Sequence, residues 1–412
     1  MRAERVEELS FRTVKAIHDS KIGKRVCSAR TEVNTRMKIG VITCWYKDLS
    51  MANYSYNLQA ALGSRVDLQI VSAPCVCWQR FVGIKDVFQG NCEFSSFPPY
   101  LPILETDSAP KILRPLVFLT RLLLQLLRGI SYLAKCKDCD IIHYQQSSAF
   151  QFGIGPLYML LSIPTSKKRI VTVHWLQPLN RLEFFYRSYK KADRIIVHSS
   201  DMQKRILSFG VPASKIRIVP HGASLPPLIG LPRKEITFFG APNEGKGFLT
   251  ILRALKLLKD KSREVQLHIY GIYSEEEKSK AINDAVTIGV ADMLVWKGRL
   301  SEADFDRKMQ ESMFTLAPYL SHVSGSSIIT RAMGSATPII ASRVGGIPEY
   351  LGRGGLLVKP DAPEALASAM IKLIDNESLR QSLSDEARRK AETFAWDRVA
   401  EMAFEIYYEC MR

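Results

Sequence analysis

Ser324, Gly325, Ser326 and Ser327 form a short polar turn that precedes an apolar helical pattern. The first N–H groups of a helix have no partner inside it, so several of them can converge on one anion. The serine hydroxyls add further hydrogen-bond donors at the same place. This turn therefore predicts a binding site for a phosphate group that needs no metal ion. An ordinary turn of an α/β domain is the alternative.

A second candidate loop follows a short β-branched run at residues 338–341. Gly345 and Gly346 lack Cβ atoms, so a ligand can approach the main chain closely there. Either motif on its own is a weak signal, and an ordinary turn is again the alternative. We assign both glycines to the same ligand site as the serine-rich turn.

A third loop carries a lysine. The apolar run 236–239 is followed by the sequence GAPNEGKG and then by a helical pattern, FLTILRALKLLK. Lys246 lies in this loop and supplies a full positive charge for a diphosphate. We therefore add Gly240, Gly245 and Gly247 to the anion site. A solvated loop lysine is the alternative for Lys246.

Alternating strand and helix patterns indicate the elements that position these loops. A chain of 412 residues, 46% of them hydrophobic, exceeds what one hydrophobic core usually organises. Short apolar runs between longer helical patterns are typical of parallel βαβ units. The strands that we predict are residues 38–43, 66–71, 141–143, 170–173, 194–198, 236–239, 265–270, 294–297, 314–317 and 338–341. The sequence thus predicts an α/β fold of two domains with a hinge near 221–231.

A series of short segments, in order from about Met37 to the C-terminus, carries a family resemblance. The segments are MKIGVITCWY, CDIIHYQ, RIVTVHW, ADRIIVHSSDMQKRIL, IRIVPHGA, FFG with KGF, LHIYG, VWKGRLSEADF, APY, RAMGSATPIIASRVGGIPE, GGLLVKPDAPEALASAM and FAWDRVAEMAFEIYYE. No single segment is diagnostic. Through their order and spacing, the chain resembles the GT-B glycosyltransferases, and among them the retaining group called family 4 or group 1.

The resemblance implies two Rossmann-like domains of the GT-B fold that face each other across a cleft. Residues 37–225 would form an acceptor-binding N-terminal domain, and residues 226–395 would form a C-terminal domain that binds a nucleotide-sugar. The helix at 396–412 would pack back on the N-terminal domain. Residues 1–36 match nothing, and we expect an N-terminal extension that is disordered or that precedes the natural start of the chain.

The sequence departs from the family pattern at three positions. The family usually has a Glu-x7-Glu pair ahead of an Ala-Met pair, and Val323 and Arg331 stand at those two places. Ala241 stands where the family has an arginine. The chain therefore resembles a subset of relatives that lack the acidic pair. We expect Arg331 to approach the diphosphate or the nucleotide, with a helix-surface arginine as the alternative.

His174 follows the strand pattern 170–173. Ligands gather at strand ends in parallel sheets, and the resemblance implies that a histidine at this place lies close to the reacting sugar and the acceptor. We assign catalytic roles to His174 and Lys246, with a packed core histidine as the alternative for His174. We expect structural or rim positions for the other histidines that follow apolar strands, His143, His198 and His221.

The net charge of +16 is confined to the first half of the chain. Residues 1–225 hold 32 Lys and Arg against 16 Asp and Glu, whereas residues 226–412 hold 25 against 25. Such a basic half attracts either nucleic acid or an anionic membrane surface.

The segment 111–135 favours the membrane. Arg114, Arg121, Arg128 and Lys135 recur at every seventh residue, and nearly all other residues there are apolar. On a helix these cations form a narrow basic stripe beside a broad hydrophobic surface. The apolar runs are too short to span a bilayer, so we expect a helix in the headgroup region of an anionic membrane. An internal helix with snorkelling arginines is the alternative.

We expect no nucleic-acid partner, because no nucleic-acid-binding motif accompanies these charges. The sequence shows no secretory signal and no transmembrane pattern, which predicts a cytoplasmic protein associated peripherally with the inner face of the cytoplasmic membrane. The eight cysteines lack zinc-site spacing, and we interpret them as reduced thiols. We expect no metal ion and no cofactor, since the nucleotide-sugar is a substrate.

We interpret the chain as a hexosyltransferase-type glycosyltransferase, retaining and metal-independent as the resemblance implies. It would transfer a sugar from a nucleotide-sugar donor to a glycan acceptor. A lipid-linked acceptor is favoured, in the assembly of surface polysaccharide or lipopolysaccharide. The missing acidic pair leaves one alternative open, namely a catalytically inactive partner subunit that binds the nucleotide-sugar without turnover.

Overall fold

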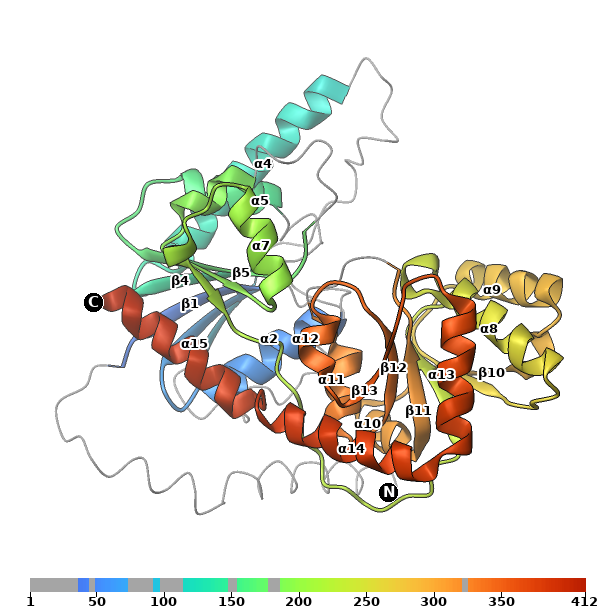
Figure 1. Ribbon diagram of the computed structural model, residues 1–412. Coiled ribbons are helices and arrows are strands. Elements are labelled where there is room, and N and C mark those ends of the chain that lie inside the picture. Colours follow the sequence, from blue (N-terminus) through green and yellow to red (C-terminus); the bar gives the residue numbers. More distant parts are fainter. Residues whose placement is uncertain are drawn as a thin grey trace, which may run out of the picture.

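The computed structural model describes residues 36–43, 49–72, 92–96, 114–146, 154–176, 186–320 and 325–412. These residues form two α/β lobes that lie beside each other (Figure 1). The expected N-terminal extension lies almost entirely outside the described residues, and so do Val323 and Ser324.

The N-terminal lobe is built on a seven-stranded parallel sheet in the order β3-β2-β1-β4-β5-β6-β7. Its strands are β1 (Lys38–Thr43), β2 (Asp67–Ser72), β3 (Cys92–Ser96), β4 (Ile141–Gln146), β5 (Lys168–Val173), β6 (Arg194–Val197) and β7 (Ile216–Ile218). Its helices are α2 (Leu49–Leu62), α4 (Arg114–Lys135), α5 (Ile154–Ser162) and α7 (Ser200–Ser208). Residues Ile39, Val41 and Ile42 of β1 are all buried, because helices cover both faces of a parallel sheet.

The C-terminal lobe contains a six-stranded parallel sheet in the order β10-β9-β8-β11-β12-β13. Its strands are β8 (Glu235–Phe239), β9 (Leu267–Tyr270), β10 (Leu294–Gly298), β11 (Ser312–Ala317), β12 (Ile339–Ser342) and β13 (Gly355–Val358). Its helices are α8 (Phe248–Asp260), α9 (Glu275–Ile288), α10 (Glu302–Glu311), α11 (Ser327–Gly334), α12 (Ile347–Leu351), α13 (Pro363–Asp375) and α14 (Glu377–Glu392). The predicted α/β fold with two Rossmann-like domains is confirmed. In this sheet the strand order reverses between β8 and β11, and ligands of such sheets bind outside the carboxyl ends of the strands at that reversal.

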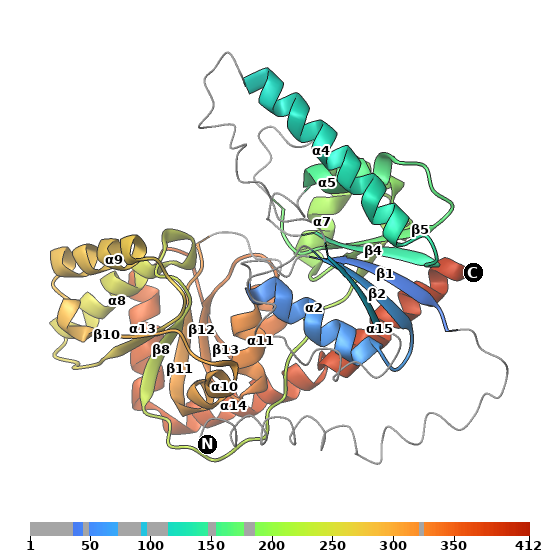
Figure 2. The same ribbon diagram turned by 180° about the vertical axis from the view of Figure 1, so that it is seen from behind.

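The chain passes between the lobes twice, at neighbouring places. Ala223 and Ala395 form an isolated parallel bridge, and Ala223 N donates to Phe394 O at 2.9 Å. After the second crossing, α15 (Trp396–Met411) packs against α2 of the N-terminal lobe (Figure 2). The last helix of the chain is therefore part of the N-terminal lobe.

His143 attaches α15 to the N-terminal sheet. Its two ring nitrogens each lie 2.7 Å from a hydroxyl, Nδ1 from that of Tyr407 on α15 and Nε2 from that of Thr172 on β5. Burial lowers the pKa of His143 to about 3. The ring is thus a neutral structural residue, as the sequence predicts.

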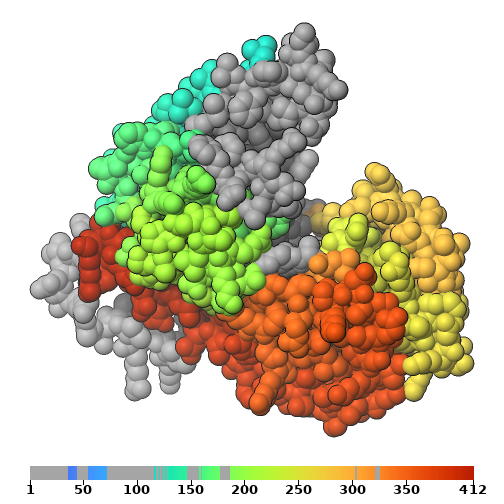
Figure 3. Space-filling model, turned by 45° about the horizontal axis from the view of Figure 1, so that its top comes forward, coloured from blue at the N-terminus to red at the C-terminus, as the bar shows by residue number. Residues whose placement is uncertain are grey.

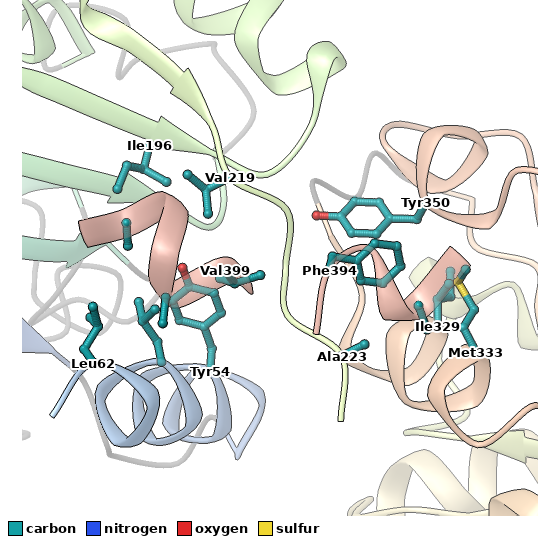
Figure 4. Packing of buried hydrophobic residues seen from close by; sticks show 14 of the residues in the cluster. Tyr54, Leu62, Ile196, Val219, Ala223, Ile329, Met333, Tyr350, Phe394 and Val399 are labelled. Carbon is teal, nitrogen blue, oxygen red and sulfur yellow. The ribbon is translucent and has the colours of Figure 1, made fainter. Parts of the chain in front are cut away.

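One hydrophobic cluster runs through both lobes at the crossings. Its buried members include residues of both sheets and of α2, α11, α12, α15 and the crossing segments. Figure 4 shows among them Tyr54, Leu62, Val219, Ala223, Ile329, Met333, Tyr350, Phe394 and Val399. The lobes are therefore held together on the side of the crossings. In the space-filling view, green atoms of the N-terminal lobe lie directly against orange atoms of the C-terminal lobe (Figure 3).

Candidate functional site

The carboxyl ends of β8, β11 and β12 lie side by side, because β11 pairs with both other strands. All three strands are parallel, so the segments that follow them emerge at one edge of the sheet. Gly240 begins the first of these segments, Pro318 the second and Arg343 the third. The structure therefore brings together the three loops that the sequence assigns to one anion.

The lysine loop is fixed to the segment that follows β11. Leu320 N donates to Gly245 O at 3.1 Å. Gly247 has a φ of 70°, and a Cβ atom built on it would lie only 1.9 Å from Pro318 O. Only glycine fits this approach, so the position of Lys246 is set by contact between the two loops.

Tyr319 lies between Lys246 and the start of α11. The ammonium nitrogen of Lys246 is 4.2 Å from the centroid of the Tyr319 ring, which is a cation–π distance. The Tyr319 hydroxyl is 3.3 Å from Ser326 Oγ, and the side chain is buried. Sequence reasoning missed Tyr319, since a tyrosine after an apolar strand carries no signal of its own.

Helix α11 begins beside this lysine. Ser326 caps the helix, because its Oγ accepts a hydrogen bond from Ile329 N at 3.4 Å. Ser327 is the first residue of the helix. The described part of the predicted serine turn is thus the N-terminus of a helix, and its binding of an anion stays a prediction.

Tyr350 joins the start of α11 to the N-terminal lobe. Its hydroxyl accepts from His221 N at 2.6 Å and donates to His198 O at 2.7 Å. A Cβ atom on Gly325 would lie 3.3 Å both from this hydroxyl and from the Cβ of His221. The N-terminal turn of α11 therefore lies at the junction of the lobes.

The third loop leads into another contact between the lobes. Gly345 has a φ of 52°, and Gly346 precedes α12. Glu349 of α12 accepts two hydrogen bonds from Ser200 at the start of α7, from N at 2.8 Å and from Oγ at 2.7 Å. The carboxylate thus stabilises the N-terminus of a helix in the opposite lobe.

Arg331 lies against α10. Its guanidinium forms an ion pair with Asp306 at 2.8 Å and lies 3.9 Å above the ring of Phe305. Its side chain is 12% exposed, so the residue is not a fully exposed surface arginine. Contact between Arg331 and the donor stays a prediction. In the structure, the guanidinium is paired with Asp306 instead.

On the N-terminal side, two histidines form a hydrogen-bonded pair. His198 Nδ1 lies 2.9 Å from Val219 O, and a carbonyl oxygen only accepts, so this nitrogen carries the proton. Neutral His198 then accepts at Nε2 from His174 Nδ1, which lies 2.8 Å away. Burial, followed by the effect of neighbouring histidines, lowers the pKa of His174 well below its usual value. Neutral His174 thus has its lone pair on Nε2.

Tyr54 of α2 lies at the centre of these rings. Its ring centroid is 4.4 Å from that of His174 and 5.2 Å from those of His198 and His221. Trp396, the first residue of α15, lies 5.4 Å from Tyr54. This aromatic packing fixes the imidazoles at the junction, and the sequence gives no sign of Tyr54 because residues 49–62 carry no chemical motif.

The arrangement places a side suited to an anion near a side of neutral imidazoles. Lys246 offers an ammonium group, and the first turn of α11 offers N–H groups that have no partner inside the helix, whereas His174 offers an uncharged acceptor. Preorganised donors of this kind stabilise negative charge as it develops on a leaving group. Within the described ranges, no group of three or more His, Cys, Asp or Glu side chains is placed to hold a metal ion.

Comparison with known proteins gives two family matches and several relatives. The family model described as Glycosyltransferase Family 4 matches residues 88–225, and the one described as Glycosyl transferases group 1 matches residues 233–376. The chain is 26% identical to MMP alpha-(1->4)-mannosyltransferase of Mycolicibacterium hassiacum, over 66% of this chain and 70% of that protein. It is 25% identical to phosphatidyl-myo-inositol mannosyltransferase of Mycolicibacterium smegmatis, over 66% and 71%.

The fold is likewise shared with solved structures. HepE from Anabaena, in complex with UDP, superposes with a TM-score of 0.68 at 13% identity, over 90% of this chain and 100% of that chain. The two family matches together cover more than half of the chain, with residues in both lobes, and the chain therefore belongs to the GT-B glycosyltransferases of family 4.

Proposed function

We propose that this glycosyltransferase transfers a sugar from a nucleotide-sugar to a lipid-linked acceptor, with retention at the anomeric carbon and without a metal ion. One observation carries the proposal. The ammonium group of Lys246 and the N-terminus of α11 lie together in the C-terminal lobe near the junction of the lobes. The neutral His174–His198 pair lies in the N-terminal lobe.

The chemistry of the donor fits this arrangement. When the bond to the sugar breaks, negative charge grows on the departing diphosphate, and Lys246 and the amides of α11 stabilise it. The lysine thereby supplies the positive charge that a metal ion supplies in other enzymes. His174, with its lone pair on Nε2, accepts a hydrogen bond from a sugar hydroxyl and orients the ring.

Turnover with defined donors tests the proposal. The protein is incubated with UDP- and GDP-sugars, with and without membrane extract and with and without EDTA, and released nucleoside diphosphate is measured. We expect release that depends on the extract and persists in EDTA. Nucleotide binding without turnover across the whole panel would instead indicate the inactive partner subunit, and loss of turnover in EDTA would refute metal independence.

A lipid-linked acceptor is supported by relatives and by α4. One relative acts on phosphatidyl-myo-inositol according to its name. On α4, Leu116, Leu123, Leu127 and Ile130 are each about half exposed or more, at 62, 55, 53 and 49%. Spacings of seven, four and three residues place them on one face of the helix.

The opposite face of α4 packs on the lobe near the C-terminal end of the helix. Gly129 and Tyr132 are buried there, Cys136 is buried just after the helix, and α4 contacts α5 (Figure 1). Because the exposed leucines share the helix with Arg114, Arg121 and Arg128, we assign this face to an anionic membrane surface. None of the described helices combines the length and apolar character that a membrane crossing needs. Peripheral attachment at the cytoplasmic face would bring the acceptor of surface polysaccharide or lipopolysaccharide assembly to the site.

Vesicle binding tests the membrane face. Replacing Leu123 and Leu127 with Glu removes apolar area and adds two negative charges, so binding to phosphatidylserine vesicles should fall by about 100-fold or more. Val286→Glu is the matched control, because Val286 is 62% exposed on α9 of the other lobe. Equal cosedimentation of the double variant and this control would remove α4 from the membrane.

A further inference from the structure

Tyr319 contacts both Lys246 and Ser326, the helix-capping residue of α11, at the proposed anion site. It is 1% exposed, although it follows the end of β11 and adjoins the loops at the sheet edge. Its ring faces Lys246 at 4.2 Å, and its hydroxyl lies 3.3 Å from Ser326 Oγ. A buried tyrosine placed in this way connects the lysine loop to the start of α11.

The backbone around Tyr319 is held on both sides. Tyr319 N donates to Ala317 O at 2.9 Å, and Leu320 N donates to Gly245 O at 3.1 Å. Pro318 O lies against Gly247, where no side chain fits. The ring therefore has little freedom to move away from Lys246, and the ammonium group is held at a fixed place relative to α11.

The hydroxyl of Tyr319 also affects what Ser326 can donate. Ser326 Oγ already accepts from Ile329 N. When Tyr319 donates as well, both acceptor positions of the serine oxygen are filled, and the proton of Ser326 is directed to a third oxygen. A phosphate oxygen at the N-terminus of α11 is such an acceptor.

We propose that Tyr319 is a positioning residue for the donor diphosphate. It holds the Lys246 ammonium through its ring and directs the Ser326 hydroxyl through its own. The inference rests on the proposed function, because it assigns a role within the same nucleotide-sugar site. Tyr319 itself touches no reacting atom and acts only through these two side chains.

Double-mutant cycles test the ring. The dissociation constants of UDP and GDP are measured by titration calorimetry for Tyr319→Leu, Lys246→Met and the double variant. We expect Tyr319→Leu alone to weaken binding of the preferred nucleotide by about 3- to 30-fold. In the Lys246→Met background the same change should weaken binding clearly less, because the ring has lost its partner and only the loss of the hydroxyl beside Ser326 remains.

Matched variants separate this role from a merely structural one. Lys256→Met serves as the control, since Lys256 is an exposed lysine of α8 that pairs with Asp260, and its effect should add to that of Tyr319→Leu. Tyr319→Phe keeps the ring and should restore the lysine-dependent part of the affinity. The loss of nucleotide affinity that remains in Tyr319→Phe should disappear when Ser326 is replaced by Ala as well.

The outcomes distinguish the inference from the proposed function. Wild-type protein that binds neither UDP nor GDP, nor their sugars, would overturn both. Wild-type binding together with equal losses from Tyr319→Leu in the two lysine backgrounds would overturn only the role of Tyr319. If Tyr319→Leu does not fold, the cycle of Tyr319→Phe with Ser326→Ala decides, and additive losses there count against the inference.

Discussion

Replacing Tyr350 with Phe should lower the free energy of unfolding of this protein measurably. The hydroxyl of Tyr350 accepts a hydrogen bond from His221 N and donates one to His198 O. Both bonds are buried at the junction between the lobes. Burial raises the pKa of Tyr350, so the hydroxyl keeps its proton and donates at any ordinary pH. Phenylalanine fills nearly the same volume and leaves both partners buried without this bond.

The magnitude follows from those two partners. Each buried polar group that loses its hydrogen bond costs about 1–3 kcal/mol. Losses above about 4 kcal/mol are exceptional for one substitution, so we expect a decrease of about 2–4 kcal/mol. Urea unfolding, followed by circular dichroism and by tryptophan fluorescence, measures it.

Tyr408→Phe is the matched control. Tyr408 lies on α15, is 46% exposed, and its hydroxyl accepts a hydrogen bond from Arg412. Loss of an exposed hydroxyl should change the free energy of unfolding by less than about 0.5 kcal/mol. If Tyr350→Phe and Tyr408→Phe shifted the urea midpoint equally, the bridging role of the Tyr350 hydroxyl would be refuted.

Three further predictions concern charge, pH and backbone geometry. Lys246→Met should reduce the rate of sugar transfer by about 100-fold or more, as initial rates will show, whereas Lys256→Met should leave it unchanged; equal rates would remove Lys246 from the site. The free energy of unfolding should be highest above about pH 6.5 and should fall as the pH drops toward 3–4. The reason is that histidines of the unfolded chain take up protons that the buried histidines of the folded protein do not. At pH 5 this loss is about 2 kcal/mol for each histidine, and urea unfolding at pH 7 and 5 measures it. A flat profile would contradict the neutral, buried state of the three rings whose pKa burial lowers to about 3, 3 and 4, namely His143, His198 and His221. Gly247→Ala should lower both the melting temperature and UDP affinity, because Cβ meets Pro318 O. Gly289 has a similar φ of 82°, but a Cβ atom built on it would meet no atom within 4 Å. Gly289→Ala should therefore lower the melting temperature less and leave UDP binding unchanged. Equal effects of the two substitutions would exclude the steric cause.

Much of the fold could be predicted because buried parallel strands are continuous apolar runs. All ten predicted strands are present, with ends that differ by at most three residues. The strands that sequence reasoning missed are β3, β7 and β13, and all three are short. All three lie at sheet edges, so each needs less apolar sequence than a central strand.

The candidate site was predictable only where the backbone defines it. Glycine and serine at strand ends identify the lysine loop and the start of α11, because those positions depend on local geometry. Tyr319, Asp306 and Tyr54 were missed, since their relevance comes from side-chain contacts between segments distant in sequence. On α4, the sequence predicted a broad hydrophobic surface, and the exposed side chains that the structure describes there include Leu116, Leu123, Leu127 and Ile130.

The return of α15 has a practical consequence for making chimeric enzymes. A donor-binding half excised as everything after the linker would carry away a helix that anchors to β4 through Tyr407 and His143. The N-terminal half would then expose the surface of α2 that α15 covers. An interchangeable cassette should therefore begin just after Ala223 and stop just before Ala395, so that both splice points fall at the paired crossing and each half keeps its own packing.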